Sequence, residues 1–183
     1  MPVGIRREYN APAETFTGAQ NTLGHLRERI WERIALLLGT GLGVGYFPLA
    51  PGTVGSLWGV ALVWGLQQLA WPLFAVLSFA VVFFLCGIPI CTRAAKSLGR
   101  EDPGEIVFDE IAAFPIVFLL VPMSLATGIL GFLWFRLFDI VKPWPANRFE
   151  RLSRGLGVMA DDLIAGIYAA AMLMLSVKVL SLE

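Results

Sequence analysis

The chain has 183 residues, of which 57% are hydrophobic and only 15% are charged. Soluble domains usually carry about 25% charged residues, so this composition excludes a typical cytosolic domain or a disordered chain and indicates a membrane protein. The 14 basic residues balance 14 acidic ones, which argues against a nucleic-acid binder, because such proteins need a basic surface. Two cysteines and one histidine argue against a Cys/His metal site or a disulfide framework.

The first 33 residues are polar and lack the apolar core of a secretory signal. We expect residues 1–33 to remain in the cytoplasm as an N-terminal segment and residues 34–183 to form a single membrane-embedded domain. Residues 22–38 predict an amphipathic helix, which either lies at the membrane surface or packs on the rest of the protein. Its apolar residues recur at helical spacing and are Leu23, Leu26, Ile30, Ile34 and Leu37.

Apolar stretches near the length of a membrane span, about 20 residues, follow this segment. They are residues 54–70, 72–92, 107–121, 123–141 and 160–180. The third is short and contains Pro115, which makes it kinked or only partly spanning. Residues 34–46 are apolar but short and glycine-rich, and could be re-entrant. The fold class expected is therefore all-α, a polytopic membrane helix bundle of about four to five spans.

The basic residues predict the orientation of this bundle, because cytoplasmic loops are enriched in Lys and Arg. They precede the first span and fill the second and fourth connections, whereas the other two connections are short and uncharged. We therefore expect the long loops to face the cytoplasm. A count of five spans would place the C-terminus outside.

This topology places five carboxylates at the cytoplasmic ends of the apolar segments, namely Asp109, Glu110, Asp139, Asp161 and Asp162. Carboxylates at the edge of apolar segments are costly to desolvate and are therefore functional candidates. The alternative is that they are solvated helix starts, where the helix dipole favours acids. Asp139 fits that alternative poorly, because it lies near a helix exit.

Carboxylates gathered at one membrane face suit a hard divalent cation such as Mg²⁺, which phosphate chemistry uses to offset charge and activate water. Arg136 and Lys142 lie three residues before and after Asp139, so all three could share one helical face. Either base could hold a phosphate. The alternative is a simple ion pair within the helix.

Two further patterns accompany these charges. The segment Pro51-Gly52-Thr53-Val54-Gly55-Ser56 immediately precedes an apolar helix. Its glycines permit close backbone approach, and the helix N-terminus would attract an anion such as phosphate through residues that include Thr53, Gly55 and Ser56. The Lys-Ser/Thr of a P-loop is absent. In the last apolar stretch, small residues recur at a spacing that allows another helix to approach closely. They are Ala165, Gly166, Ala169 and Ala170.

Four segments together are distinctive: PLAPGTVGSLWG (48–59), EIVFDEIAAF (105–114), FRLFDIVKPWP (135–145) and GLGVMADDLIAG (155–166). In content and order they resemble the phosphatidylglycerophosphatase A family. The resemblance implies a Mg²⁺-dependent lipid phosphatase of the bacterial inner membrane. Such an enzyme faces the cytoplasm and converts phosphatidylglycerophosphate in that leaflet to phosphatidylglycerol and phosphate.

The resemblance also implies roles by position. Asp109, Asp139 and Asp162, with Glu110 or Asp161, would bind one or two Mg²⁺, while Arg136 and Lys142 hold the phosphoryl oxygens and Thr53, Gly55 and Ser56 contribute to phosphate binding. Either water attacks phosphorus directly or a carboxylate does so first. A small membrane transporter or a structural subunit that binds ions through the same acids is the competing class. A transporter would place the carboxylates at mid-membrane depth. A structural subunit would leave their clustering unexplained.

Overall fold

The computed structural model describes residues 13–149 and 155–181. Within these ranges the chain forms helices and no strand, which confirms the all-α prediction. The helices are α1 (Ala13–Gly39), the 3₁₀ turn η1 (Val44–Tyr46), α2 (Pro51–Gln68), α3 (Leu73–Leu98), α4 (Phe108–Val117), α5 (Leu125–Val141), α6 (Ala146–Phe149) and α7 (Gly155–Leu180).

Fewer helices could cross a membrane than the apolar pattern predicts. Among the described helices, α3 and α7, each of 26 residues, are long and apolar enough by length and composition. The predicted count of four to five spans is therefore supported for two helices only. The segment at 107–121 forms the 10-residue α4, which extends only about 15 Å.

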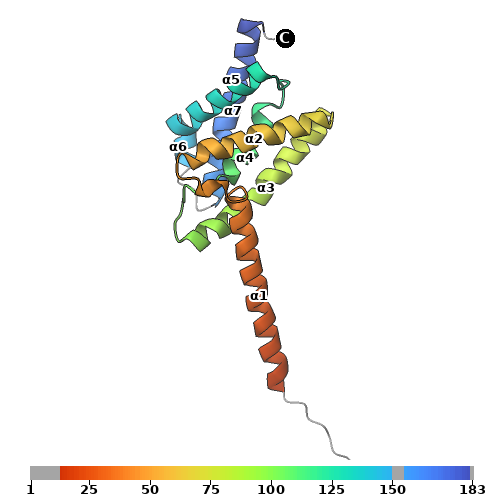
Figure 1. Cartoon of the computed structure of the whole chain (residues 1–183), viewed down its shortest axis with the longest axis vertical. Helices are drawn as coiled ribbons and strands as arrows, with labels where there is room; N and C mark the ends of the chain where they lie inside the picture. Colours follow the sequence, from red (N-terminus) through yellow and green to blue (C-terminus); the bar gives the residue numbers. More distant parts are fainter. Residues whose placement is uncertain (1–12, 150–154, 182–183) are drawn as a thin grey trace, which may run out of the picture.

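The apolar character of α4 has a different cause from that of a membrane span. The helix packs against α2, α3 and α7 and lies among them in Figure 1. Its residues are buried on nearly every side, and a helix that is hydrophobic all round is typical of a protein core as well as of a membrane span. Phe114 and Pro115 are among the most fully buried side chains.

The directions of the helices follow from their contacts. Phe108 and Ala112 of α4 cluster with Met159 early in α7, and Val117 clusters with Leu173 further along, so α4 and α7 run in the same direction. By contrast, α2 and α5 are antiparallel. Arg136, near the end of α5, donates to Ser56 near the start of α2. Gln67, near the end of α2, accepts a hydrogen bond from the N–H of Met123, which lies just before α5.

Small residues let α4 and α7 approach closely, as the sequence predicts. A Cβ on Gly166 would lie 3.3 Å from the carbonyl oxygen of Ala113, and Ala165 and Ala169 are buried in the same interface. One helical turn before Ala113 and Gly166 lie Asp109 and Asp162. The close approach therefore brings these two carboxylates to the same level of the bundle.

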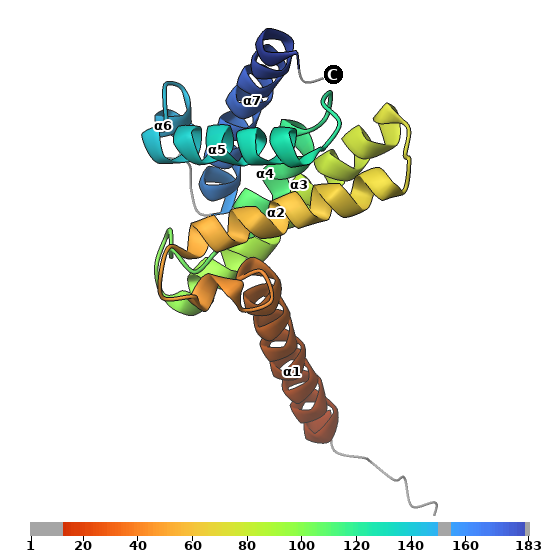
Figure 2. The same ribbon diagram turned by 45° about the horizontal axis from the view of Figure 1, so that its top comes forward.

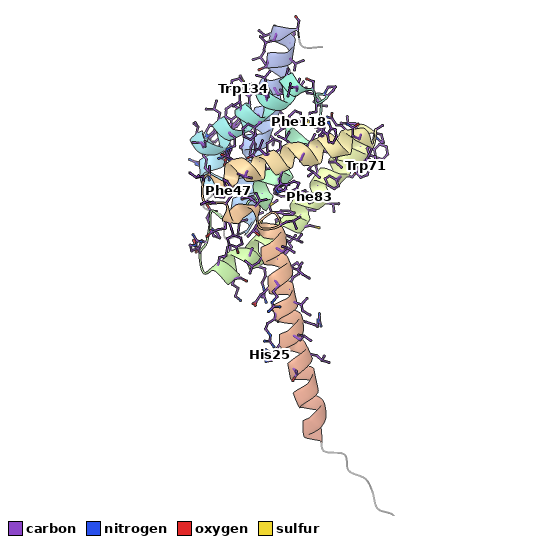
Figure 3. The ribbon with its side chains drawn as sticks, viewed as in Figure 1. His25, Phe47, Trp71, Phe83, Phe118 and Trp134 are labelled. Carbon is purple, nitrogen blue, oxygen red and sulfur yellow. The ribbon has the colours of Figure 1, made fainter. Side chains whose placement is uncertain are left out.

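The long α1 projects from one end of the bundle (Figures 1 and 2) and runs without a break across residues 33 and 34. It is amphipathic, as predicted, and its apolar stripe, from Leu23 to Leu37, is exposed. The opposite face binds α3 through ion pairs of Arg93 with Glu28 and Glu32. His25 lies on α1 away from the bundle (Figure 3).

Gly45 allows η1 to lie against the loop before α4. A Cβ at this position would lie only 1.8 Å from the carbonyl oxygen of Glu105, a backbone atom that cannot move aside. We expect Gly45→Ala to cost about 1–3 kcal/mol of stability, visible as a lower Tm in detergent. Gly104→Ala is the control, because a Cβ there meets nothing within 4 Å. An unchanged Tm for Gly45→Ala would contradict this packing.

Candidate active site

Four helices bring the predicted site residues together at one end of the bundle. They come from the first two turns of α2, the first turn of α4, the last two turns and the C-cap of α5, and the second turn of α7. Six of the ten are less than one-tenth exposed, namely Gly55, Ser56, Asp109, Glu110, Asp161 and Asp162. Polar groups from segments far apart in the sequence thus share one buried cluster, which we call the carboxylate cluster.

Arg136 joins three of these helices. Its Nη1 lies 2.7 Å from Oδ2 of Asp139 in the same helix and 3.1 Å from Oε2 of Glu110 in α4. It also donates to Oγ of Ser56 in α2 at 3.4 Å. The pair with Asp139 is the ion pair within the helix that the spacing allows, but the same guanidinium also contacts α2 and α4.

Ser56 and Gly52 place the start of α2 against Glu110. The Ser56 hydroxyl donates to Oε2 of Glu110 at 2.5 Å. A Cβ on Gly52 would lie 2.1 Å from Oε1 of the same carboxylate and 3.1 Å from Nη1 of Arg136. A side chain at position 52 would therefore displace the Glu110 carboxylate, so Gly52 permits the close approach of α2 and α4.

The other predicted phosphate-binding residues of α2 have separate surroundings. The N–H of Thr53 donates to the carbonyl of Ala50 at 3.0 Å, so that N–H already has a partner. A Cβ on Gly55 would lie 2.5 Å from Cβ of Val107. The structure thus shows Gly55 as a close-packing position between α2 and the residue preceding α4.

Lys142 connects the end of α5 to α7. It caps α5 in the left-handed conformation, with φ 44°, and its Nζ lies 2.7 Å from Oδ2 of Asp161. The loop that follows is held to α7, because the Tyr168 hydroxyl donates to the carbonyl of Trp144 at 2.8 Å. Both predicted cations therefore lie in the carboxylate cluster, each paired with acids.

Asp109 and Asp162 differ from the other carboxylates of the cluster. Among the described residues, no Lys or Arg forms an ion pair with either of them. Asp162 instead interacts electrostatically with the acids Asp109, Asp139, Asp161 and Glu110. Buried charge without a cationic partner is costly, so these two carboxylates are the candidates for binding protons or a cation.

The helix-start interpretation holds for only some of these acids. Asp109 and Glu110 lie in the first turn of α4, where the helix dipole favours them. Because α7 begins at Gly155, Asp161 and Asp162 lie in its second turn and are not helix starts. Asp139 lies in the last turn of α5, where Arg136 compensates its charge.

The donor set suits Mg²⁺ chemically, although a complete ligand shell is not assembled. In residues 13–149 and 155–181, no group of three or more His, Cys, Asp or Glu side chains is close enough to hold a metal ion. Mg²⁺, however, commonly binds one or two carboxylates and completes its shell with waters and phosphate oxygens. Asp109 and Asp162 are the two acids of the cluster that form no ion pair with a described Lys or Arg.

One acid near the cluster, Asp102, is not among the predicted site residues. Asp102, in the loop between α3 and α4, interacts electrostatically with Asp109 and Asp161. The run of acids at residues 101–105 was the available signal, but it reads as a solvated loop. Arg100 orders this loop by donating to both oxygens of Glu105, at 2.5 and 2.6 Å, which lowers the pKa of that carboxyl.

Comparison with known proteins identifies the family of this chain. A family model described as Phosphatidylglycerophosphatase A matches residues 37–177. The chain belongs to the phosphatidylglycerophosphatase A family. It is accordingly a phosphatase. The competing interpretations, a transporter or a structural subunit, are not supported by this match. Because the family match begins at residue 37, most of α1 lies outside it.

Curated relatives cover most of the chain. A phosphatidylglycerophosphatase A of Escherichia coli is 36% identical over 75% of this chain and 80% of its own length. One of Haemophilus influenzae is 40% identical over 73% and 82%. A protein of Bacteroides thetaiotaomicron, provisionally named a phosphatidylinositol-3-phosphatase, is 36% identical over 74% and 89%. No solved structure matches the chain.

Proposed function

We propose that the chain hydrolyses the terminal phosphomonoester of phosphatidylglycerophosphate to phosphatidylglycerol and phosphate in a Mg²⁺-dependent reaction. The observation that carries this proposal is the buried carboxylate cluster, in which Arg136 and Lys142 lie beside acids that exceed them in charge. Cations that hold a phosphate and acids that hold a divalent ion are both needed for phosphoryl transfer to water.

The residues of the cluster would have different roles in the reaction. Arg136 would bind two phosphoryl oxygens through its planar guanidinium, and Lys142 would add a point charge on the opposite side. Asp109 and Asp162 would hold Mg²⁺, with Asp139, Glu110 or Asp161 as further ligands. The ion, when bound, would offset charge on the phosphoryl group and activate water. Ser56 would keep Glu110 oriented through the hydrogen bond between them.

The position of the carboxylate cluster at the helix ends supports a particular orientation of the bundle in the membrane. Helices α2, α4 and α7 begin at it, whereas α5 ends there. We propose that this end of the bundle faces the cytoplasm of a bacterial inner membrane, with α2 and α5 embedded beside the apolar α3 and α7. In this topology α7 leads away from the cluster, so the C-terminus lies on the opposite face. A lipid phosphate at the cytoplasmic surface then meets the cluster at its own depth.

Substrate selectivity tests this proposal. Phosphate release should be measured from phosphatidylglycerophosphate, phosphatidylinositol 3-phosphate, phosphatidic acid and glycerol 3-phosphate under matched conditions. We expect kcat/KM for phosphatidylglycerophosphate to exceed each of the others by about tenfold or more, a difference of about 1.4 kcal/mol. Equal or faster release from phosphatidylinositol 3-phosphate would favour the activity named for the Bacteroides relative, and would contradict our proposal.

A further inference from the structure

Two apolar grooves flank α2. The first, of about 540 Å³, lies between α2 and α5 and is lined by Leu57, Val60, Trp64, Gly128, Ile129 and Phe132. The second, of about 370 Å³, lies between α2, α3, α4 and the turn after α1 and is lined by Leu42, Trp58, Leu62, Phe83, Phe108 and Ile111. Ala61 contributes to both grooves, so α2 forms the wall between them.

Each groove has lining residues that are next in sequence to residues of the carboxylate cluster. Leu57 and Trp58, one in each groove, directly follow Ser56 along α2. In the second groove, Phe108 and Ile111 flank Asp109 and Glu110 in the first turn of α4. A lipid whose phosphate lies in the cluster would therefore have its chains at the mouths of both grooves.

The first groove leads away from the cluster along the antiparallel pair α2 and α5, which lie side by side in Figures 1 and 2. Phe132 lies one turn before Arg136, and Gly128 one turn further still. Leu57 and Trp64 are seven residues apart in α2, which corresponds to about 10 Å along the helix. The groove thus continues in the direction that an acyl chain must take from a head at the membrane surface.

We propose that the lipid substrate straddles α2, with one acyl chain in each groove and its phosphate in the carboxylate cluster. This inference rests on the proposed function, because it takes the two-chained phosphomonoester as the ligand. The pairing of two apolar grooves with one polar cluster matches the chemistry of a diacyl lipid. Any membrane protein has lipid on its outer surface, so the distinguishing property is selectivity for a chain that is attached to the bound head.

A substitution that fills the first groove tests this placement. A Cβ on Gly128 meets only Cγ of Met123, at the ordinary contact distance of 3.8 Å, and Gly128 lines the groove. Gly128→Leu therefore adds bulk to the groove. The matched control is Gly65→Leu in α2, where a Cβ meets nothing within 4 Å and which lines neither groove. Both changes replace glycine within a helix and should raise its helical propensity alike.

Chain length provides the readout. Gly128→Leu should lower kcat/KM for both lipids relative to wild type. We expect the loss to be about tenfold greater for dipalmitoyl phosphatidylglycerophosphate than for the dihexanoyl lipid, because the long chain loses the packing of about two methylenes. Gly65→Leu should match wild type within about twofold on both lipids. A loss by Gly128→Leu that is independent of chain length, or no loss, would overturn the proposal.

Photo-crosslinking tests the placement without catalysis. Phosphatidylglycerophosphate with a diazirine at the chain end should label α2, α5 and the wall of the second groove in proteoliposomes of excess phosphatidylcholine. Unlabelled substrate, but not phosphatidylcholine, should compete. Labelling spread evenly over the lipid-facing helices would overturn the placement. Selective labelling by a protein that releases no phosphate would instead sustain the placement and contradict the proposed function.

Discussion

Asp162→Asn should leave the protein inserted and folded but lower phosphate release by about a thousandfold, equivalent to about 4 kcal/mol of transition-state stabilisation. Asp162 is only 4% exposed, interacts with four other acids and forms no ion pair with a described residue. Asparagine has the same shape but cannot supply the charge that holds a divalent ion. The loss should therefore appear in kcat and persist as the Mg²⁺ concentration is raised.

Stability separates this role from a structural one. Removing an uncompensated buried charge should leave Tm unchanged or raise it, whereas loss of a structural contact would lower it. Glu101→Gln is a suitable control, because Glu101 is an exposed acid in the α3–α4 loop. It should retain wild-type activity. If purified Asp162→Asn keeps wild-type activity across a Mg²⁺ titration, the assignment of Asp162 as a ligand is wrong.

Arg136→Lys should lower kcat/KM by about a hundredfold, even though the charge is kept. The guanidinium contacts Ser56, Glu110 and Asp139 from one position, and a lysine ammonium cannot reproduce this planar geometry. A loss of about 2.7 kcal/mol in transition-state stabilisation corresponds to this factor. Both KM and kcat should change, because Arg136 would bind the phosphoryl group before and during transfer.

The matched control for this change is Arg93→Lys. Arg93 also pairs with two acids, Glu28 and Glu32, but these lie on α1 and outside the carboxylate cluster. We expect kcat/KM of Arg93→Lys to stay within about threefold of wild type, with any effect confined to Tm. Equal losses of activity in both variants would mean that Arg136 acts only by holding the fold together.

The sequence predicts the helical class and the members of the cluster because both depend on local pattern. Hydropathy locates the apolar helices, and the rarity of charge within them makes each remaining acid conspicuous. Hydropathy cannot tell a helix surrounded by lipid from one surrounded by protein. That is why residues 107–121 resemble a weak span, although α4 is a short buried helix among α2, α3 and α7.

The contacts between helices could not be predicted in the same way. Spacing placed Arg136 and Asp139 together within one helix, but the reach of Arg136 to Glu110 and Ser56 depends on how three helices cross. The close approach of Gly52 to the Glu110 carboxylate comes from the same crossing. The proximity of Asp102 to the cluster likewise depends on how the α3–α4 loop lies relative to Asp109 and Asp161.

If the carboxylate cluster hydrolyses a lipid phosphomonoester with the help of a divalent cation, removal of that cation should stop the reaction. The most direct test is phosphate release from phosphatidylglycerophosphate by the full-length protein in proteoliposomes, first in excess chelator and then with Mg²⁺ restored. We predict no release in chelator, recovery with Mg²⁺, and no recovery in Asp109→Asn or Asp162→Asn. An undiminished rate in chelator, or recovery in both variants, would contradict the account.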